Sequence, residues 1–315
     1  DADTKLLLRK IGRNPKVILT NQIDAGLFAA SDALWNPETS IPTKVQIIEA
    51  NPRRFSRESI CESHRTHKSI LRALIMNQSM PALALVRSGR ALVDSGALAP
   101  DFNYGYQDAE LWVEVQRRYR ELPPDVQCLH VVKAWAALHR MDTITLTNAN
   151  YRGIAELLSE AYFLCRTKSA DMEALRGLQF VLGLDVSGST QWVENSCGGP
   201  GMHNLRAGDM IFLVADMIYH ATGGTAVMVQ FSGDAQQIAW TKTRSLTHLL
   251  HFARTGRPFG CTNPGAAIDM ARAAKFPADA VVVLTDNDVN RGAGGSCDAK
   301  LNAYRREIDR AIMGL

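Results

Sequence analysis

Three mainly apolar runs lie in the C-terminal half of the chain, and two of them lead into an aspartate. Residues 180–184 precede Asp185, residues 281–285 precede Asp286, and the third run covers residues 226–231. Apolar runs of this length predict strands that are buried on both faces, as in a parallel sheet. The two aspartates are therefore expected at the carboxyl ends of buried strands.

Segments with helical spacing of apolar residues separate these runs. They cover residues 209–220, 245–253, 264–274 and 299–313. Ser245 is a candidate N-cap for the second segment, and Pro264 is a favoured first-turn residue for the third. Strands that alternate with helices predict a doubly wound parallel α/β sheet over residues 177–315.

Residues 1–176 have no alternation of period two, and their apolar residues recur at helical spacing, as at Leu71, Leu74 and Ile75. The pattern predicts short helices at residues 4–12, 44–50, 57–77, 80–95, 106–120, 126–141 and 151–167. Short helices joined by short loops are typical of an α-solenoid. The chain is thus expected to hold a helical domain, residues 1–176, followed by the α/β domain, residues 177–315.

The polar residues after the strand at 180–184 indicate a binding site. Asp185, Ser187 and Ser189 alternate at the carboxyl end of the predicted strand, where open α/β sheets bind their ligands. A carboxylate and two hydroxyls offer only hard oxygen ligands, which suit Mg²⁺, Mn²⁺ or Ca²⁺ and not zinc. The alternative interpretation is an ordinary strand-to-turn sequence without a metal.

With Thr262 and Asp286 downstream, this pattern resembles the DxSxS…T…D motif of von Willebrand factor A (vWA) domains and their metal-ion-dependent adhesion site, or MIDAS. The resemblance implies a divalent cation, Mg²⁺ first, with five inner- or outer-shell ligands: Asp185, Ser187, Ser189, Thr262 and Asp286. That family adds further strand–helix units after the strand that ends at Asp286. Because this sequence stops at Leu315 after one predicted helix, we expect a C-terminally shortened domain.

Positive charge is concentrated at the start of the chain. The net charge is +3, but residues 1–90 carry 14 Lys and Arg against 8 Asp and Glu, whereas residues 177–315 carry 12 of each. The densest part is residues 53–72, where His64 and His67 lie between arginines and Phe55 could stack on a base. Such a cluster favours phosphate contact with salt-dependent affinity. The alternatives are that the basic residues form a solvated helix face and that Phe55 belongs to the core.

Several strings also resemble the Ro ribonucleoprotein (TROVE) family, in which helices precede a vWA domain. Residues 77–89 resemble the family's MPxxALLRNLGKM helix, residues 126–138 its HPFHILIALETY helix and residues 154–163 its ILKALDAAF helix. Residues 260–262 and 285–288 resemble its GGTD and TDNE strings. The resemblance covers about residues 64–315 and implies a helical domain of HEAT-like repeats.

The Ro resemblance implies RNA binding, to single-stranded or small structured RNA, on basic residues of the helical domain. The candidates are Arg53, Arg54, Arg57, His64, Arg65, His67, Lys68, Arg72, Arg87 and Arg90. The helical part is much shorter than the family's closed ring, so we expect an arc that could be completed by homo-oligomerisation. A second class of function stays open: a docking module without RNA, whose MIDAS binds an acidic protein partner.

Other classes of function have little support in the sequence. GxSxG, HExxH, P-loop and GxGxxG motifs are all absent, which argues against an enzyme. No apolar run approaches the length of a membrane span, and no signal peptide is visible. The six scattered cysteines lack a CxxC pair and favour reduced thiols over a disulfide scaffold or zinc site. We therefore expect a cytoplasmic protein.

Overall fold

The computed structural model describes residues 25–101, 106–123, 126–140, 144–168, 170–191, 205–240, 245–255, 261–286 and 297–313. The predicted helix at residues 4–12 lies outside these ranges. The chain divides into two compact units. Unit 1 comprises residues 1–126 and 148–158, and unit 2 comprises residues 127–147 and 159–315. Each unit is described by itself.

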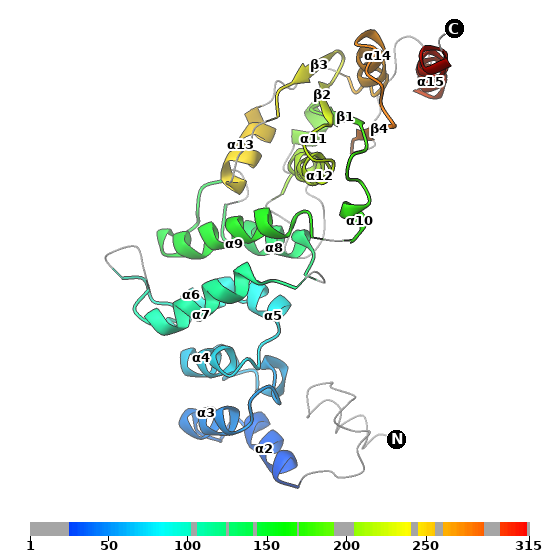
Figure 1. Cartoon of the computed structure of the whole chain (residues 1–315). Helices are drawn as coiled ribbons and strands as arrows, with labels where there is room; N and C mark the ends of the chain where they lie inside the picture. The colour runs from blue at the N-terminus through cyan, green and yellow to red at the C-terminus, as the bar shows by residue number, and fades with distance from the viewer. Residues whose placement is uncertain are drawn as a thin grey trace, which may run out of the picture. The chain divides into compact units, whose positions relative to one another are not determined.

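Unit 1 is helical. Its elements are α2 (Ala25–Trp35), α3 (Ile41–Ala50), η2 (Arg57–Ser59), α4 (Lys68–Met76), α5 (Ala82–Arg87), α6 (Gly89–Asp94), α7 (Ala109–Arg120), η3 (Ala149–Tyr151) and the first half of α9 (Arg152–Cys165). Helices α2, α3, α4 and α7 pack against one another in succession (Figure 1). This arrangement agrees with the predicted solenoid of short helices.

Two predicted helices of unit 1 are broken in the structure. Residues 57–77 do not form one helix, because the chain turns after η2 and α4 begins only at Lys68. The His67 side chain caps this start by accepting a hydrogen bond from the Ser69 N–H, 3.3 Å. Residues 80–95 form α5 and α6, which meet at Ser88, whose hydroxyl donates to the Ala84 carbonyl, 2.7 Å. Hydroxyl groups compete in this way for helix carbonyls, and Gly89 follows as a weak helix former.

Caps fix the starts of the helices more closely than the apolar pattern does. Ser40 accepts a hydrogen bond from the Thr43 N–H, so α3 begins at Ile41. Asp108 accepts one from the Leu111 N–H, 3.0 Å, so α7 begins at Ala109 and not at residue 106. Both side chains satisfy N–H groups that the first turn of a helix leaves without partners.

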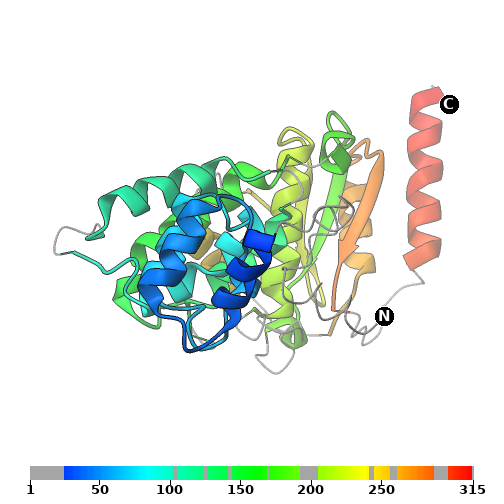
Figure 2. The ribbon, with the colours of Figure 1, turned by 90° about the horizontal axis from the view of Figure 1, so that it is seen from below.

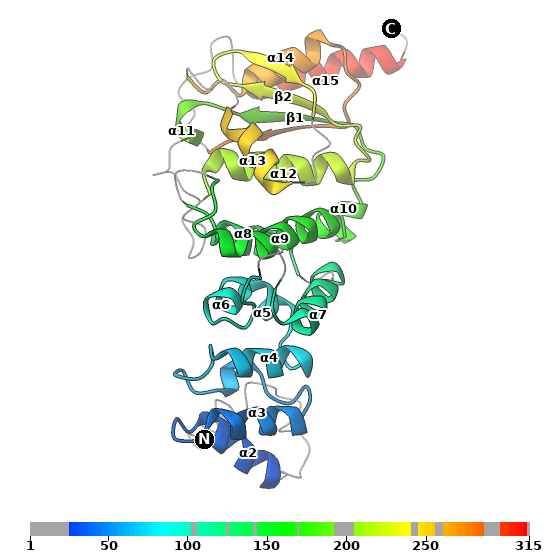
Figure 3. The ribbon, with the colours of Figure 1, turned by 90° about the vertical axis from the view of Figure 1, so that its left-hand side faces the viewer.

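Unit 2 contains a sheet between two layers of helices. Its elements are α8 (Cys128–Ala136), the end of α9, α10 (Ala170–Glu173), β1 (Phe180–Asp185), α11 (Gly188–Gln191), α12 (Ala207–Ala221), β2 (Val227–Phe231), β3 (Ala235–Ile238), α13 (Leu246–Thr255), α14 (Gly265–Ala273), β4 (Ala280–Leu284) and α15 (Cys297–Met313). Figure 3 shows α14 and α15 on one face of the sheet and α12 and α13 on the other.

The described sheet has the strand order β3-β2-β1-β4. Strand β1 pairs in parallel with β2 on one side and β4 on the other, as Figure 2 shows for β1 and β4. These three strands confirm the predicted parallel sheet. Strand β3 was not predicted, and it runs antiparallel to β2 at the edge.

Strand β1 lies at the centre of this sheet, and all six of its residues are buried. Burial on both faces explains its continuous apolar sequence. Of the helices that the structure describes, none has the length and apolar character needed to span a lipid bilayer.

Candidate metal site and basic surface

The end of β1 forms the centre of the candidate metal site. The Asp185 side chain is fully buried, and the side chains of Ser187 and Ser189 are also buried. The Ser187 N–H donates a hydrogen bond to Asp185 Oδ1, 2.8 Å, and the two serine hydroxyls lie 3.2 Å apart. The loop therefore curls so that the carboxylate and both hydroxyls gather at one point.

Neighbouring strands bring the other two predicted ligands to the same edge of the sheet. Asp286 follows β4, which pairs with β1 so that Leu284 lies opposite Leu184. Thr262 precedes Asn263, whose N–H donates to the Ser232 carbonyl, 2.8 Å, just beyond the end of β2. Since β2 and β4 flank β1 in parallel, Thr262 and Asp286 lie beside the end of β1, and the two aspartates are on the same edge.

The electrostatics of this edge suit a cation. Burial raises the pKa of Asp185 above its usual range, and the charge of Asp286 raises it further. Hydrogen bonds from Ser187 and from the Thr285 hydroxyl, 2.6 Å from Asp185 Oδ2, act in the opposite direction. Two carboxylates that disfavour each other's charge are stabilised when a cation binds between them.

The hydroxyl of Thr262 provides an independent test of the fit. Its residue is 1% exposed, and its Oγ1 atom has no hydrogen-bond partner in the described part of the protein. A buried hydroxyl without a partner is rare because desolvation is costly. The described residues contain no group of three or more His, Cys, Asp or Glu suited to a metal. A site here would therefore rest on two carboxylates and three hydroxyls, a donor set of hard oxygens.

The ten predicted RNA contacts do not form one uniform surface. Six have exposed side chains, namely Arg53, Arg54, His67, Lys68, Arg87 and Arg90, and four are half-buried, namely Arg57, His64, Arg65 and Arg72. His64, Arg65, His67 and Lys68 lie at the start of α4, whereas the backbone N–H of Arg53 contacts Ser79 after the end of α4, 3.0 Å. The candidates thus split between the two ends of this helix.

Four arginines lie around helix α5, with Arg53 and Arg54 near the α4–α5 connection and Arg57 and Arg87 near the junction of α5 with α6. Arg53 donates to the Gln78 side chain, and Arg57 reaches the Ser88 hydroxyl, 3.4 Å, next to Arg87. Arg54 lies beside Arg53 in the same turn. None of the four has a carboxylate within ion-pair distance among the described residues. We call Arg53, Arg54, Arg57 and Arg87 the arginine cluster.

Two other candidates are held by carboxylates. Arg72 forms ion pairs with Asp108, 2.7 Å, and Glu110, 2.5 Å, which join α4 to α7. Arg90 pairs with Asp94, 3.3 Å. Their charges are partly neutralised, so they contribute less to an anion-binding surface. Phe55 is 1% exposed and belongs to the core, so base stacking by Phe55 is excluded.

Three other polar features of the structure were not predicted from the sequence. Arg118, half-buried on α7, donates to the Met80 carbonyl. Lys44 is fully buried, and its Nζ lies 2.9 Å from Cys61 Sγ. Asp216 on α12 is a fully buried carboxylate with several partners. A helical pattern shows which positions are buried, but it does not show which polar groups meet across helices.

The comparisons with known proteins agree with the fold. Residues 179–312 match the family model of the Ro60 vWA domain. The structure resembles the crystal structure of the RO (RSR) protein of Deinococcus radiodurans, with a TM-score of 0.67 and 18% sequence identity. The similarity covers 92% of this chain and 56% of that protein. Among curated proteins, none matches the sequence. Residues 179–312 are thus similar to the Ro60 vWA domain, and the chain shares the fold of that Ro protein.

Proposed function

We propose that this chain is a Ro-like RNA-binding protein, a subunit of a small ribonucleoprotein, whose vWA domain holds a divalent cation. The observation that carries the RNA-binding half is the arginine cluster on the helical unit. Residues 51–90 contain eight Lys and Arg against two Asp and Glu, and the four arginines of the cluster have no ion-pair partners among the described residues. Phosphate groups of RNA would supply the missing anions.

Charge reversal tests the cluster. The triple variant Arg53→Glu, Arg54→Glu and Arg57→Glu should weaken binding of a single-stranded RNA, measured by fluorescence anisotropy over a range of salt concentrations. Each lost phosphate contact should reduce the slope of log affinity against log salt by roughly 0.7. The matched control reverses Arg140, Arg176 and Arg305, exposed arginines of unit 2, and changes the net charge equally.

The result also separates a local site from a general charge effect. If both triple variants weaken RNA binding equally, net charge and not the cluster determines affinity. If neither the affinity nor the salt slope changes, the cluster is a solvated surface and RNA does not bind there. Arg87→Glu, alone, should act in the same direction as the triple variant because Arg87 neighbours Ser88, which Arg57 contacts.

We further propose that Asp185, Ser187, Ser189, Thr262 and Asp286 hold Mg²⁺, with Mn²⁺ or Ca²⁺ as alternatives. The buried Thr262 hydroxyl without a partner supports this assignment. When bound, the cation would supply a Lewis-acid position for an oxygen ligand such as the carboxylate of an acidic protein partner. We propose a docking role and no catalytic step for this site. Isothermal titration with MgCl₂, MnCl₂ and CaCl₂ should show binding that Thr262→Val weakens.

The alternative function, a docking module without RNA, makes a different prediction. Purified protein would then carry no nucleic acid, and it would retain an acidic partner only when Mg²⁺ is present. Under our proposal, RNA copurifies with the protein and dissociates as salt is raised, which the absorbance at 260 nm reports. Sequencing of that RNA would identify the natural ligand.

A further inference from the structure

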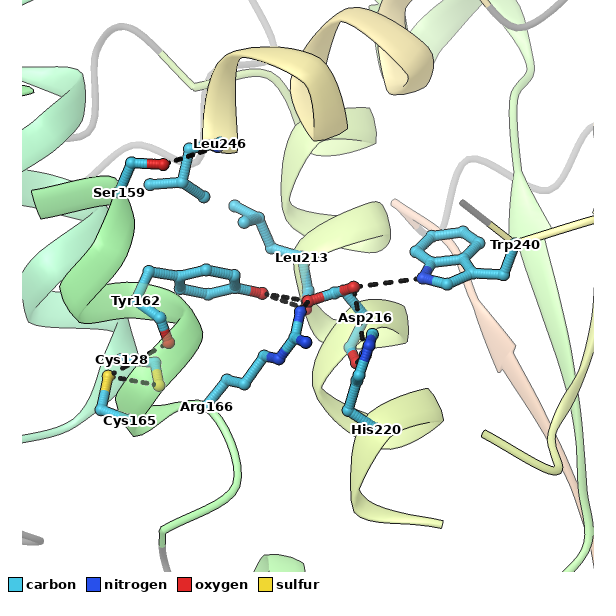
Figure 4. A network of polar contacts seen from close by, with 10 residues as sticks. All are labelled: Cys128, Ser159, Tyr162, Cys165, Arg166, Leu213, Asp216, His220, Trp240 and Leu246. Carbon is cyan, nitrogen blue, oxygen red and sulfur yellow. Dashed lines mark hydrogen bonds and ion pairs between the residues drawn. The ribbon is translucent and has the colours of Figure 1, made fainter. Parts of the chain in front are cut away.

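Two cysteines that are far apart in the sequence meet where α8 and α9 lie together in unit 2. Cys128 is the first residue of α8, Cys165 is the last residue of α9, and their Sγ atoms are 2.9 Å apart (Figure 4). Both side chains are buried, at 5% and 7% exposure. Of the four cysteines whose side chains the structure describes, only these two contact each other.

The surroundings make the two thiols unequal. The hydrogen bond with Cys128 lowers the pKa of Cys165, burial opposes this, and the charge of Lys168 adds to the lowering. The same hydrogen bond and burial raise the pKa of Cys128. A thiolate is the nucleophilic form of cysteine, so the lowered pKa favours Cys165 as the attacking sulfur.

We propose that Cys128 and Cys165 are a redox-active dithiol that hydroperoxides convert reversibly to a disulfide. In the first step, the Cys165 thiolate attacks one oxygen of hydrogen peroxide, the O–O bond breaks, and hydroxide leaves and takes a proton to become water. Cys165 is then a sulfenic acid. In the second step, Cys128 sulfur displaces that hydroxyl, its proton leaves with it as a second water, and the S–S bond forms. Two thiols are oxidised, and one peroxide is reduced to two waters.

The burial of Cys128 and Cys165 limits the size of the oxidant that can reach them. Because the two residues are only 5% and 7% exposed, a folded protein disulfide cannot approach their sulfurs, and the oxidant must be as small as hydrogen peroxide. We therefore assign peroxides, and not protein disulfides, as the oxidant class.

The disulfide would join α8 to the C-terminal end of α9, which also contacts the vWA domain. One turn before Cys165, the Tyr162 hydroxyl donates to the buried carboxylate of Asp216 on α12, 3.1 Å, and the next residue, Arg166, pairs with the same carboxylate, 2.7 Å (Figure 4). A covalent link at Cys165 would restrict the segment between the two cysteines in the unfolded chain. Oxidation should therefore raise the thermal midpoint of unit 2.

Peptide mapping tests the proposal on the full chain. Reduced protein is treated with hydrogen peroxide, digested without reductant and analysed by mass spectrometry. We expect a peptide that joins Cys128 to Cys165, lighter by two hydrogens than its reduced halves, and its loss after dithiothreitol. Cys128→Ser should leave a sulfenic acid that dimedone traps at Cys165. Cys165→Ser should leave Cys128 without its partner and abolish this cross-link.

Matched controls use the other described cysteines. Cys61→Ser removes a buried thiol, Cys261→Ser removes an exposed one, and neither should change the cross-link. The proposal is overturned if Cys128 and Cys165 in folded protein are oxidised without joining, or if they join only in protein unfolded by urea. It is also overturned if each links with equal yield to other cysteines. Far-ultraviolet circular dichroism of each serine variant establishes that it is folded before oxidation.

Discussion

Four side chains contact the buried carboxylate of Asp216 in the described part of unit 2. Tyr162 and Trp240 donate hydrogen bonds, both 3.1 Å, Arg166 forms an ion pair, 2.7 Å, and His220 lies 3.3 Å away (Figure 4). Removing one member of a buried ion pair leaves the other charge without compensation. At the residue scale, this carboxylate therefore balances the charge of Arg166 and joins α9 to α12.

Replacement of Asp216 should be strongly destabilising. Asp216→Asn should lower the free energy of unfolding by about 3 kcal/mol, because the Arg166 charge, 12% exposed, stays buried without its partner. Tyr162→Phe should cost about 1 kcal/mol, the usual net value of one hydrogen bond. Urea unfolding measures both. Arg176→Ala, at an exposed ion pair with Glu173, is the control and should change stability by less than about 0.5 kcal/mol.

Asp216 also predicts how stability depends on pH. Burial raises its pKa, but the hydrogen bond from His220 and the charge of Arg166 outweigh burial and hold the pKa below the ordinary value of 3.8. The unfolded chain thus takes up this proton at a higher pH than the folded chain. The stabilisation is complete above pH 3.8 and is lost as the pH falls through the lowered pKa. Urea unfolding at decreasing pH should show this loss in the wild type and not in Asp216→Asn.

Asp185 differs from Asp216, because among the described residues no cationic side chain contacts its buried carboxylate. In metal-free buffer, Asp185→Asn should raise the thermal midpoint, since it removes a charge that burial and Asp286 disfavour. In the wild type, Mg²⁺ at 100 times its dissociation constant should add about 2.7 kcal/mol of stability. Differential scanning fluorimetry should show that Asp185→Asn loses this response. A variant that is less stable without metal and still responds to Mg²⁺ would contradict the assignment.

At the scale of elements, β1 and α14 approach so closely that only glycine fits between them. A Cβ atom on Gly183 would lie 2.9 Å from Ala267 Cβ and 3.4 Å from the Phe231 ring. Gly183→Ala should therefore lower the free energy of unfolding by about 1–3 kcal/mol, the usual range for overpacking. Gly233→Ala is the control, because a Cβ there meets no described atom within 4 Å. Equal effects of the two variants on urea unfolding would mean that the close approach is not limiting.

The elements that the sequence predicted well are those with a continuous apolar pattern. Strands β1, β2 and β4 were found within a residue or two, because each contains at least three consecutive apolar residues. Burial on both faces was correct only for β1, since β2 includes Gln230 and β4, at the edge of the described sheet, is half-buried throughout. Strand β3 has the sequence AQQI and half-exposed or exposed positions, so it carries no such pattern. In unit 1, apolar spacing alone predicted single helices over residues 57–77 and 80–95. The turn before Lys68 divides the first, and the hydroxyl of Ser88 lies where the second divides.

The candidate metal site was predictable because its residues follow buried strands, and parallel neighbours bring strand ends together. The split of the basic residues between the two ends of α4 was not predictable, because the number of charges in a segment does not tell where their side chains lie. Likewise, the contact of Cys128 with Cys165 depends on how α8 packs against α9, and a separation of 37 positions gives no information about it.

At the scale of the whole molecule, the number of copies in solution is a further prediction. On α2, the first described helix of unit 1, Phe28 and Trp35 are exposed at 36% and 42%. Exposed apolar side chains that lie together on one helix can mark a surface covered by a partner or a second copy. We therefore expect several copies to associate, which light scattering at increasing protein concentration would show. Trp35→Lys should shift the distribution toward monomer, whereas a strictly monomeric wild type that binds RNA would contradict this prediction.

The two proposed activities lie in different units, so each should survive the loss of the other. The arginine cluster belongs to unit 1, and Asp185 belongs to unit 2. Asp185→Ala should remove most Mg²⁺ binding and leave the affinity for single-stranded RNA within a factor of about two, since no phosphate contact is lost. The triple reversal at Arg53, Arg54 and Arg57 should weaken RNA binding and leave the Mg²⁺ titration unchanged. If Asp185→Ala instead abolished RNA binding while unfolding by urea stayed cooperative, RNA would bind at the metal site or depend on it, and the assignment of RNA to the helical unit would be wrong.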